Sequence, residues 1–212
     1  MTDIIIETIT KQNNSLMRLK IWKSIYKYSS LNNRTVKTKY LECLIKNSKY
    51  EDQIQKDLSR TFIDDPNFKK GRSNYKKLNN LLLAYSNFNQ TIGYAQGLNF
   101  IVASCLLILQ EEEEVFMFVD GLMNKFKFSR LIGVNNGAKY ALEQIGKLIE
   151  KYCPKLVRHL SENLLNHEFF TANWLITIFA NTVKYHNLFK IWDLFIIFGW
   201  KFINNFITAI II

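Results

Sequence analysis

Proline and glycine are scarce in this chain, whose 212 residues include 2 prolines and 8 glycines. These two residues interrupt helices and build tight turns, so their scarcity favours long helices over many short strands. Hydrophobic residues make up 48% of the chain and aromatic residues 14%, which excludes an intrinsically disordered protein. The length suits one hydrophobic core, and we expect a single domain or a piece of a larger one.

Cysteine is also rare, and its spacing excludes two common kinds of site. Cys43, Cys105 and Cys153 are odd in number, far apart and without a CxxC pair. This arrangement supports neither a zinc site nor a disulfide framework. We therefore expect three buried thiols in a reducing compartment. Neither HExxH nor GxSxG occurs, so we expect no metal and no cofactor of the protein's own.

The sequence lacks a phosphate-binding P-loop and a secretory signal. No GxxxxGK[ST] occurs, and the Gly/Asn segment 133–137 is interpreted as an ordinary loop. Any nucleotide would therefore have to arrive on a partner. The N-terminus opens acidic and its Ile4–Ile6 run is too short for a signal peptide, so we expect a cytoplasmic protein. Residues 1–14 have no apolar period and are predicted to be a flexible lead-in.

A membrane-spanning segment is not expected either. The apolar stretch from Leu194 to Ile212 is interrupted by Lys201, Asn204 and Asn205, which favours a buried helix over a bilayer span. The chain is still apolar at its last residues, as an unfinished core would be. We therefore expect the domain to continue beyond residue 212, so that this chain is truncated at its C-terminus.

Positive charge is abundant, with a formal net charge of +10. Basic proteins tend to meet phosphates, anionic membranes or acidic proteins, and net charge alone does not choose among them. The segment 68–77 concentrates lysine and arginine, with Phe68 and Tyr75 interleaved. It is compatible with a nucleic-acid backbone, an anionic membrane or an acidic protein surface, and equally with a solvated basic loop.

Apolar residues recur at helical spacing along most of the chain, and no convincing strand alternation occurs. We therefore predict an all-α fold with a buried central helix at 97–109 and with Pro154 at the first position of a helix. The other helices are expected from residue 15, at 36–46, at 50–61, after a loop and N-cap at 71–73, and at 115–126, 136–151, 155–164, 171–182, 186–198 and 201–212.

Two short polar segments stand out from this helical pattern. Ile54–Arg60 places the carboxylate of Asp57 and the guanidinium of Arg60 one helical turn apart. Considered alone, the two residues are most simply a surface ion pair worth tenths of a kcal/mol. The alternative is that Asp57 orients Arg60 toward a phosphate chain, which suits the planar fork of donors on arginine.

The second segment is Gly93-Tyr94-Ala95-Gln96-Gly97. The two glycines allow a tight turn or a close approach to a partner. Gln96 is then either an amide that lines this turn or a side chain that positions a water molecule. An oriented arginine and a positioned glutamine are the two side chains that accelerate GTP hydrolysis.

Further landmarks join these segments in a fixed order. Arg18 and Trp22 form RxxxW, Ile54–Arg60 is IxxDxxR, and 93–100 reads GYxQGxNF. Trp174 follows, and then Trp192 with Asp193. In this order the landmarks resemble the TBC domain of Rab GTPase-activating proteins, from about residue 15 to the end. From the residues alone, the three tryptophans are expected in the core, and Arg18 and Asp193 in structural pairs or caps.

The resemblance implies an activity exerted on a partner. Arg60 matches an arginine finger and Gln96 a glutamine finger, both supplied in trans to a Rab GTPase that carries the GTP and Mg²⁺. Asp57 would position Arg60, Tyr94 would help fix the glutamine loop, and Gly93 and Gly97 would leave room for the Rab. The implied role is the regulation of vesicle trafficking, with a peripheral contact to endomembranes.

A second reading of the same resemblance is a non-catalytic module that binds a Rab without accelerating hydrolysis. The two readings differ in whether the GTP hydrolysis rate rises on binding. Nucleic acid is not an expected partner under either of them.

Overall fold

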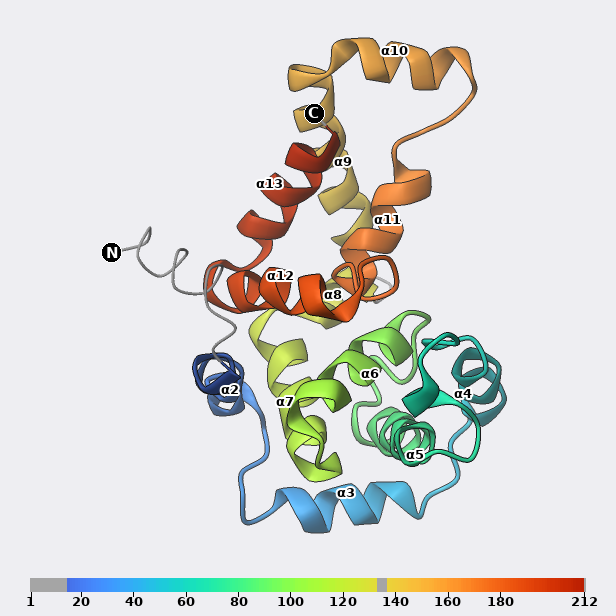
Figure 1. Cartoon of the computed structure of the whole chain (residues 1–212), viewed down its shortest axis with the longest axis vertical. Coiled ribbons are helices and arrows are strands. Elements are labelled where there is room, and N and C mark those ends of the chain that lie inside the picture. Colours follow the sequence, from blue (N-terminus) through green and yellow to red (C-terminus); the bar gives the residue numbers. More distant parts are fainter. Residues whose placement is uncertain (1–14, 133–136, 212) are drawn as a thin grey trace. The chain divides into compact units, whose positions relative to one another are not determined.

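The computed structural model describes residues 15–132 and 137–211, and the lead-in expected for residues 1–14 lies outside the described residues. Over the described ranges the chain is built from helices and loops without a strand (Figure 1). The all-α prediction is thus confirmed. By their contacts the residues divide into two compact units, one up to Ser129 and one from Arg130.

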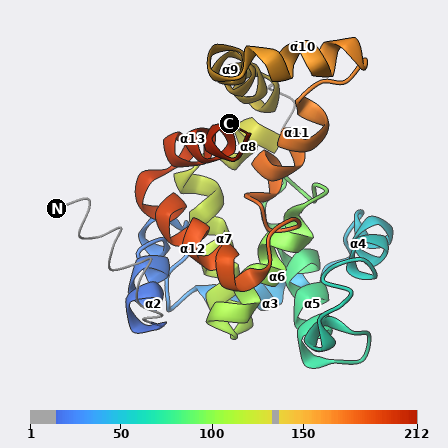
Figure 2. The ribbon, with the colours of Figure 1, turned by 45° about the horizontal axis from the view of Figure 1, so that its top comes forward.

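Unit 1 contains six α-helices and two short 3₁₀ turns, at Tyr26–Tyr28 and Pro66–Phe68, within its described residues. α5 contacts α3, α4, α6 and α7, which makes it the hub of this unit (Figures 1 and 2). The short α8 (Phe128–Ile132) spans the boundary between the units. The six helices are α2 (Ser15–Lys23), α3 (Val36–Leu44), α4 (Glu51–Leu58), α5 (Ser73–Phe88), α6 (Leu98–Leu109) and α7 (Glu112–Lys125).

Helix α6 is the buried central helix that the apolar run predicts. Nine of its twelve residues are buried, and it packs between α5 and α7. Each fully buried leucine, isoleucine or valine side chain contributes about 1.5–3 kcal/mol through removal from water. Glu112–Glu114 form the first turn of α7, where their charge complements the helix dipole.

The aromatic residues of unit 1 fill the space around these helices. Trp22 is fully buried and its ring stacks on Phe118 at 5.1 Å between centroids, so its expected place in the core is confirmed. Leu16, near the start of α2, is exposed. The apolar spacing identified the helix, but only its C-terminal part is covered by α7 and its neighbours.

Some predicted helix ends are wrong by a few residues. The helix expected at 50–61 ends at Leu58, because the Arg60 and Thr61 amides donate to the carbonyls of Asp57 and Leu58 in tighter i to i−3 turns. Pro66 opens a separate 3₁₀ turn further along the chain. α3 likewise ends at Leu44, two residues early.

The cap expected at the start of α5 is also wrong. Arg72 is the N-cap residue, with extended backbone angles, and no side chain caps the helix. Ser73 is the first helical residue and not the cap. The loop predicted at 71–73 is therefore shorter than expected, ending one residue earlier.

Unit 2 is built around α9, which contacts α10, α11 and α13. Pro154 is the first residue of α10, as predicted. None of the helices in the described residues is both long and apolar enough to cross a membrane. The helices of this unit are α9 (Gly137–Tyr152), α10 (Pro154–Glu162), α11 (Glu168–Thr177), α12 (Tyr185–Phe198) and α13 (Trp200–Ile211).

Two tryptophans of the landmark series lie in unit 2. Trp192 is fully buried and its indole N–H donates to the carbonyl of Ile178 at 2.9 Å. Trp174 is only half-buried and stacks on Phe179 at 5.5 Å, so its expected core position is only partly right. Asp193 is buried beside Trp192 on α12.

Candidate functional site

Asp57 lies in the last turn of α4, on the buried face of this helix. Ile54 and Leu58 are buried on the same helix and anchor it to α5 and α6. This packing leaves the Asp57 side chain 5% exposed, while the Arg60 side chain, just beyond the helix, is 54% exposed. A carboxylate that is buried in this way needs partners for its oxygens.

The two oxygens of Asp57 have different partners. Oδ1 accepts from Arg60 Nε at 3.0 Å and from Arg60 Nη2 at 2.6 Å. Oδ2 accepts from the Tyr94 hydroxyl at 2.6 Å. The Arg60 guanidinium is therefore held at its base by a buried anion while more than half of the side chain faces solvent. This geometry is more specific than a surface ion pair, because one partner is buried and fixed by a third residue.

Tyr94 connects this pair to the glycine-flanked loop that carries Gln96. Burial, with a further contribution from the hydrogen bond to Asp57, raises the pKa of Tyr94 well above its usual value. Tyr94 therefore stays protonated and donates to Asp57 at neutral pH. That Tyr94 helps fix the loop carrying Gln96 stays a prediction.

Gly93 and Gly97 shape the loop in the way that the sequence predicts. Both have φ in the left-handed region, at +59° for Gly93 and +100° for Gly97. A Cβ at Gly93 would overlap the ring of Tyr50, at the start of α4. Gln96 is exposed between Tyr94 and Gly97. Asp57, Arg60 and Tyr94 are thus brought into direct contact, and Gln96 lies two residues from Tyr94 on the same loop.

Two residues of this site received no role from the sequence, Thr61 and Asn99. The Thr61 hydroxyl donates to the Asp57 carbonyl at 2.7 Å and accepts from Asn99 Nδ2 at 2.8 Å. Asn99 Oδ1 accepts the amide N–H of Gly97 at 3.2 Å. Both side chains are buried. Thr61 directly follows Arg60, and Asn99 lies two residues after Gly97 within the GYxQGxNF landmark.

The backbone after Arg60 is also shaped by an aromatic residue. Phe62 has φ of +45°, an unusual value for a residue other than glycine. Its ring packs against Phe68 at 5.3 Å and Phe100 on α6 at 5.9 Å. These contacts offset the strain of the left-handed backbone. They also attach to the core the arginine loop, residues 59–65, which carries Arg60.

The remaining landmark residues support the helices. In unit 1, Arg18 and Trp22 lie on α2 and Ile54 is buried on α4. Trp174, Trp192 and Asp193 belong to unit 2. No group of three or more His, Cys, Asp or Glu side chains suited to a metal occurs in the described part of the chain.

The basic segment 68–77 lies in the loop before α5 and in its first turns. Lys69, Lys70, Arg72 and Lys76 are exposed. Lys77 is half-buried and donates to the carbonyl of Gln110 at 2.7 Å. These exposed cations follow Arg60 in sequence by 9 to 16 residues.

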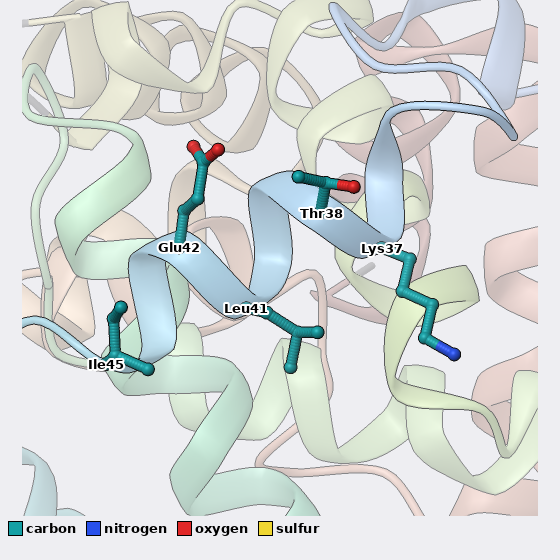
Figure 3. Close-up of a pocket in the computed structure, with 5 residues that line it drawn as sticks. All are labelled: Lys37, Thr38, Leu41, Glu42 and Ile45. Atoms are coloured by element: carbon teal, nitrogen blue, oxygen red, sulfur yellow. The ribbon is translucent and has the colours of Figure 1, made fainter.

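A shallow pocket occupies the outer face of α3, with a cavity volume of about 390 Å³ (Figure 3). It is lined by Lys37, Thr38, Leu41, Glu42 and Ile45. Ile45 is 82% exposed and Leu41 47% exposed. The pocket is lined by none of Asp57, Arg60, Tyr94, Thr61 and Asn99. It is therefore an apolar surface separate from the candidate site.

The sequence matches the model of one protein family, described as RabGAP-TBC, Rab-GTPase-TBC domain, over residues 15–212. It is 35% identical over 163 residues to TBC1 domain family member 2A of Bos taurus, covering 74% of this chain and 17% of that protein. It is 31% identical over 158 residues to Growth hormone-regulated TBC protein 1 of Xenopus laevis, covering 74% of this chain and 46% of that protein. The chain therefore spans less than half the length of these relatives.

A solved structure shares the fold. The crystal structure of the Chlamydomonas flagellar RabGAP TBC domain superposes with a TM-score of 0.79 at 21% identity. The alignment covers 96% of this chain and 69% of the other. The helical arrangement described above is thus the arrangement of a known domain.

Proposed function

This chain belongs to the Rab-GTPase-TBC domain family, and from that membership we propose that it is a GTPase-activating domain for a Rab-family GTPase. In this proposal Arg60 enters the partner's nucleotide site and offsets the charge that develops on the phosphates. Gln96 orients the attacking water. GTP and Mg²⁺ are bound by the GTPase, and this chain contributes no cofactor.

One observation carries the proposal: the Arg60 guanidinium is held by a buried carboxylate, while 54% of the Arg60 side chain is exposed. An isolated surface arginine would lose side-chain entropy when it enters a nucleotide site, whereas an oriented one has lost part of it on folding. Phosphoryl transfer depends on positioning and electrostatics, and an arginine supplied in trans is typically worth ~10³–10⁵ in rate.

Single-turnover GTP hydrolysis by a panel of Rab GTPases tests the proposal. Arg60→Ala and Gln96→Ala are each expected to remove most of the stimulation without unfolding the domain. Arg60→Lys keeps the charge but loses the planar fork, so it is expected to restore little. Matched controls are Lys56→Ala and Gln90→Ala, which remove an exposed cation and an exposed amide close by in sequence.

Two outcomes would overturn the assignment. Stimulation that survives Arg60→Ala would remove the arginine finger. GTP-dependent binding by the native chain, with an unchanged hydrolysis rate for every Rab tested, would make the domain a binding module.

We further propose that the exposed cations of segment 68–77 meet an anionic membrane while the domain acts, giving it a peripheral place on endomembranes. Co-sedimentation with phosphatidylserine vesicles tests this. Each of Lys69→Ala, Lys70→Ala and Arg72→Ala is expected to weaken binding about fivefold at low salt, since a lysine or arginine near such a surface is worth about 1 kcal/mol. Binding that is unaffected by salt would contradict the proposal.

A further inference from the structure

Thr61 and Asn99 form a buried connection between the two loops that carry Arg60 and Gln96. Thr61 directly follows Arg60, and Asn99 lies two residues after Gly97, in the first turn of α6. Their side chains meet at 2.8 Å although 38 residues separate them in sequence. Both residues are almost completely inaccessible to solvent.

The connection is continuous from the backbone of one loop to the backbone of the other. It runs from the Asp57 carbonyl to the Thr61 hydroxyl, on to the Asn99 amide, and ends at the Gly97 N–H. The Thr61 hydroxyl donates its one proton to the Asp57 carbonyl and accepts a hydrogen bond from Asn99 Nδ2. Asn99 in turn accepts the Gly97 N–H with its Oδ1, so both its amide nitrogen and its amide oxygen are hydrogen-bonded. No water is needed to join the two loops.

We propose that Thr61 and Asn99 are positioning residues that set the distance and orientation between the arginine and glutamine loops before any partner binds. The inference rests on the proposed function for its catalytic consequence. Tyr94 and Asp57 hold the side-chain end of the arginine, whereas Thr61 and Asn99 hold the backbones. Removing the Thr61–Asn99 hydrogen bond leaves the Arg60–Asp57 pair intact and lets the loop that carries Gln96 shift.

The chemistry explains why a small shift matters. Arg60 must reach the phosphates while Gln96 reaches the attacking water, and a displacement of either by about 1 Å can cost roughly a hundredfold in rate. A buried threonine and asparagine with all their polar atoms paired resist such a displacement, because breaking the pair leaves desolvated groups without partners.

Three variants separate positioning from packing. Thr61→Val keeps the shape and loses the hydroxyl, whereas Thr61→Ser keeps the hydroxyl and loses a methyl group. If Thr61 only fills space, the serine variant is the worse one; if it connects the loops, the valine variant is. Thr177→Val is the matched control, since the Thr177 hydroxyl also lies 2.7 Å from the carbonyl four residues earlier and 2.8 Å from an asparagine side chain.

Amide hydrogen exchange gives the first readout and requires no GTPase. Thr61→Val is expected to raise the exchange rate of the Gly97 amide at least about tenfold relative to Val102 in the middle of α6. Thr61→Ser and Thr177→Val leave this ratio within about twofold of the native value. An unchanged ratio in Thr61→Val, or a uniform increase across α6, overturns the connection.

Single-turnover hydrolysis gives the second readout, at a temperature where circular dichroism shows every variant folded. Thr61→Val is expected to lower the rate at saturating domain about ten- to hundredfold, with little change in the concentration giving half the maximal rate. Thr61→Ser retains most of the rate. A loosened Gly97 amide with a native rate would overturn the positioning role. If the native chain stimulates no Rab, the proposed function fails while the exchange result still decides the connection.

Discussion

Tyr94 donates a 2.6 Å hydrogen bond to Asp57 Oδ2 across 37 residues of sequence, and both residues are buried. The opposite oxygen of the same carboxylate holds Arg60. Oδ2 of Asp57 therefore contacts the buried Tyr94, whereas Oδ1 contacts the exposed Arg60. A buried anion with a neutral donor on one side and a cation on the other is satisfied at modest cost, and several measurable effects follow.

Removal of the Tyr94 hydroxyl should affect both stability and activity. Tyr94→Phe leaves Asp57 Oδ2 without its donor, which is expected to lower the free energy of unfolding by about 1–3 kcal/mol. Arg60 is then held by a less fixed carboxylate, so we expect about a tenfold loss of GTPase stimulation. Urea unfolding and single-turnover hydrolysis measure the two effects. Tyr140→Phe, at an exposed tyrosine, is the control and should change neither.

Alkaline pH should destabilise the fold in part through Tyr94. Burial and the neighbouring carboxylate raise the pKa of Tyr94 in the folded state, whereas an unfolded tyrosine titrates near pH 10. Above about pH 10 the unfolded chain loses this proton while the folded chain keeps it, so stability is complete below pH 10 and falls as the pH rises.

Urea titrations between pH 9 and 11 measure this dependence. The Tyr94→Phe variant should lose less stability over that range, with a slope shallower by up to about 1.4 kcal/mol per pH unit. Identical slopes for the variant and the native chain would show that Tyr94 ionises equally in both states.

Two glycines allow backbone strain to be separated from a steric clash. Gly71 and Gly93 both have φ in the left-handed region, but a Cβ at Gly71 would meet nothing within 4 Å, whereas one at Gly93 would overlap Tyr50. Gly71→Ala is expected to cost about 1–2 kcal/mol from strain alone. Gly93→Ala should cost about 1–3 kcal/mol more. Thermal unfolding of the two variants checks this, and equal losses would mean that the Tyr50 ring moves aside freely.

The three cysteines should differ in reactivity in the folded protein. Cys43 and Cys105 are buried, and burial raises the pKa of both thiols. Cys153 is half-exposed, so its expected burial is wrong. A thiol reagent such as Ellman's should therefore modify Cys153 first. Cys153→Ser should remove the fast phase, and a fast phase that persists would place a buried cysteine at the surface.

Much of this fold follows from local patterns in the sequence. The apolar run of α6 predicts a buried helix, because a helix that is hydrophobic on all sides has to be covered by others. The Asp57–Arg60 spacing likewise predicts their contact, since residues three apart share a helix face. In both cases the signal lies within a short stretch of sequence.

The end of α4 and the connection between the loops were not predictable in the same way. The helix stops at Leu58, and a few residues later Phe62 adopts a left-handed backbone and packs its ring on Phe68 and Phe100. Asn99 and Thr61 meet because α4 and α6 both pack against α5. Such contacts depend on tertiary packing, which no short window of sequence contains.

Every residue of the candidate site belongs to the compact unit that ends at Ser129. These residues are Asp57, Arg60, Thr61, Tyr94, Gln96 and Asn99. Their mutual spacing is therefore decided by the packing of α4, α5 and α6 within one body. The hydrogen bonds that join the two loops are thus all made inside unit 1.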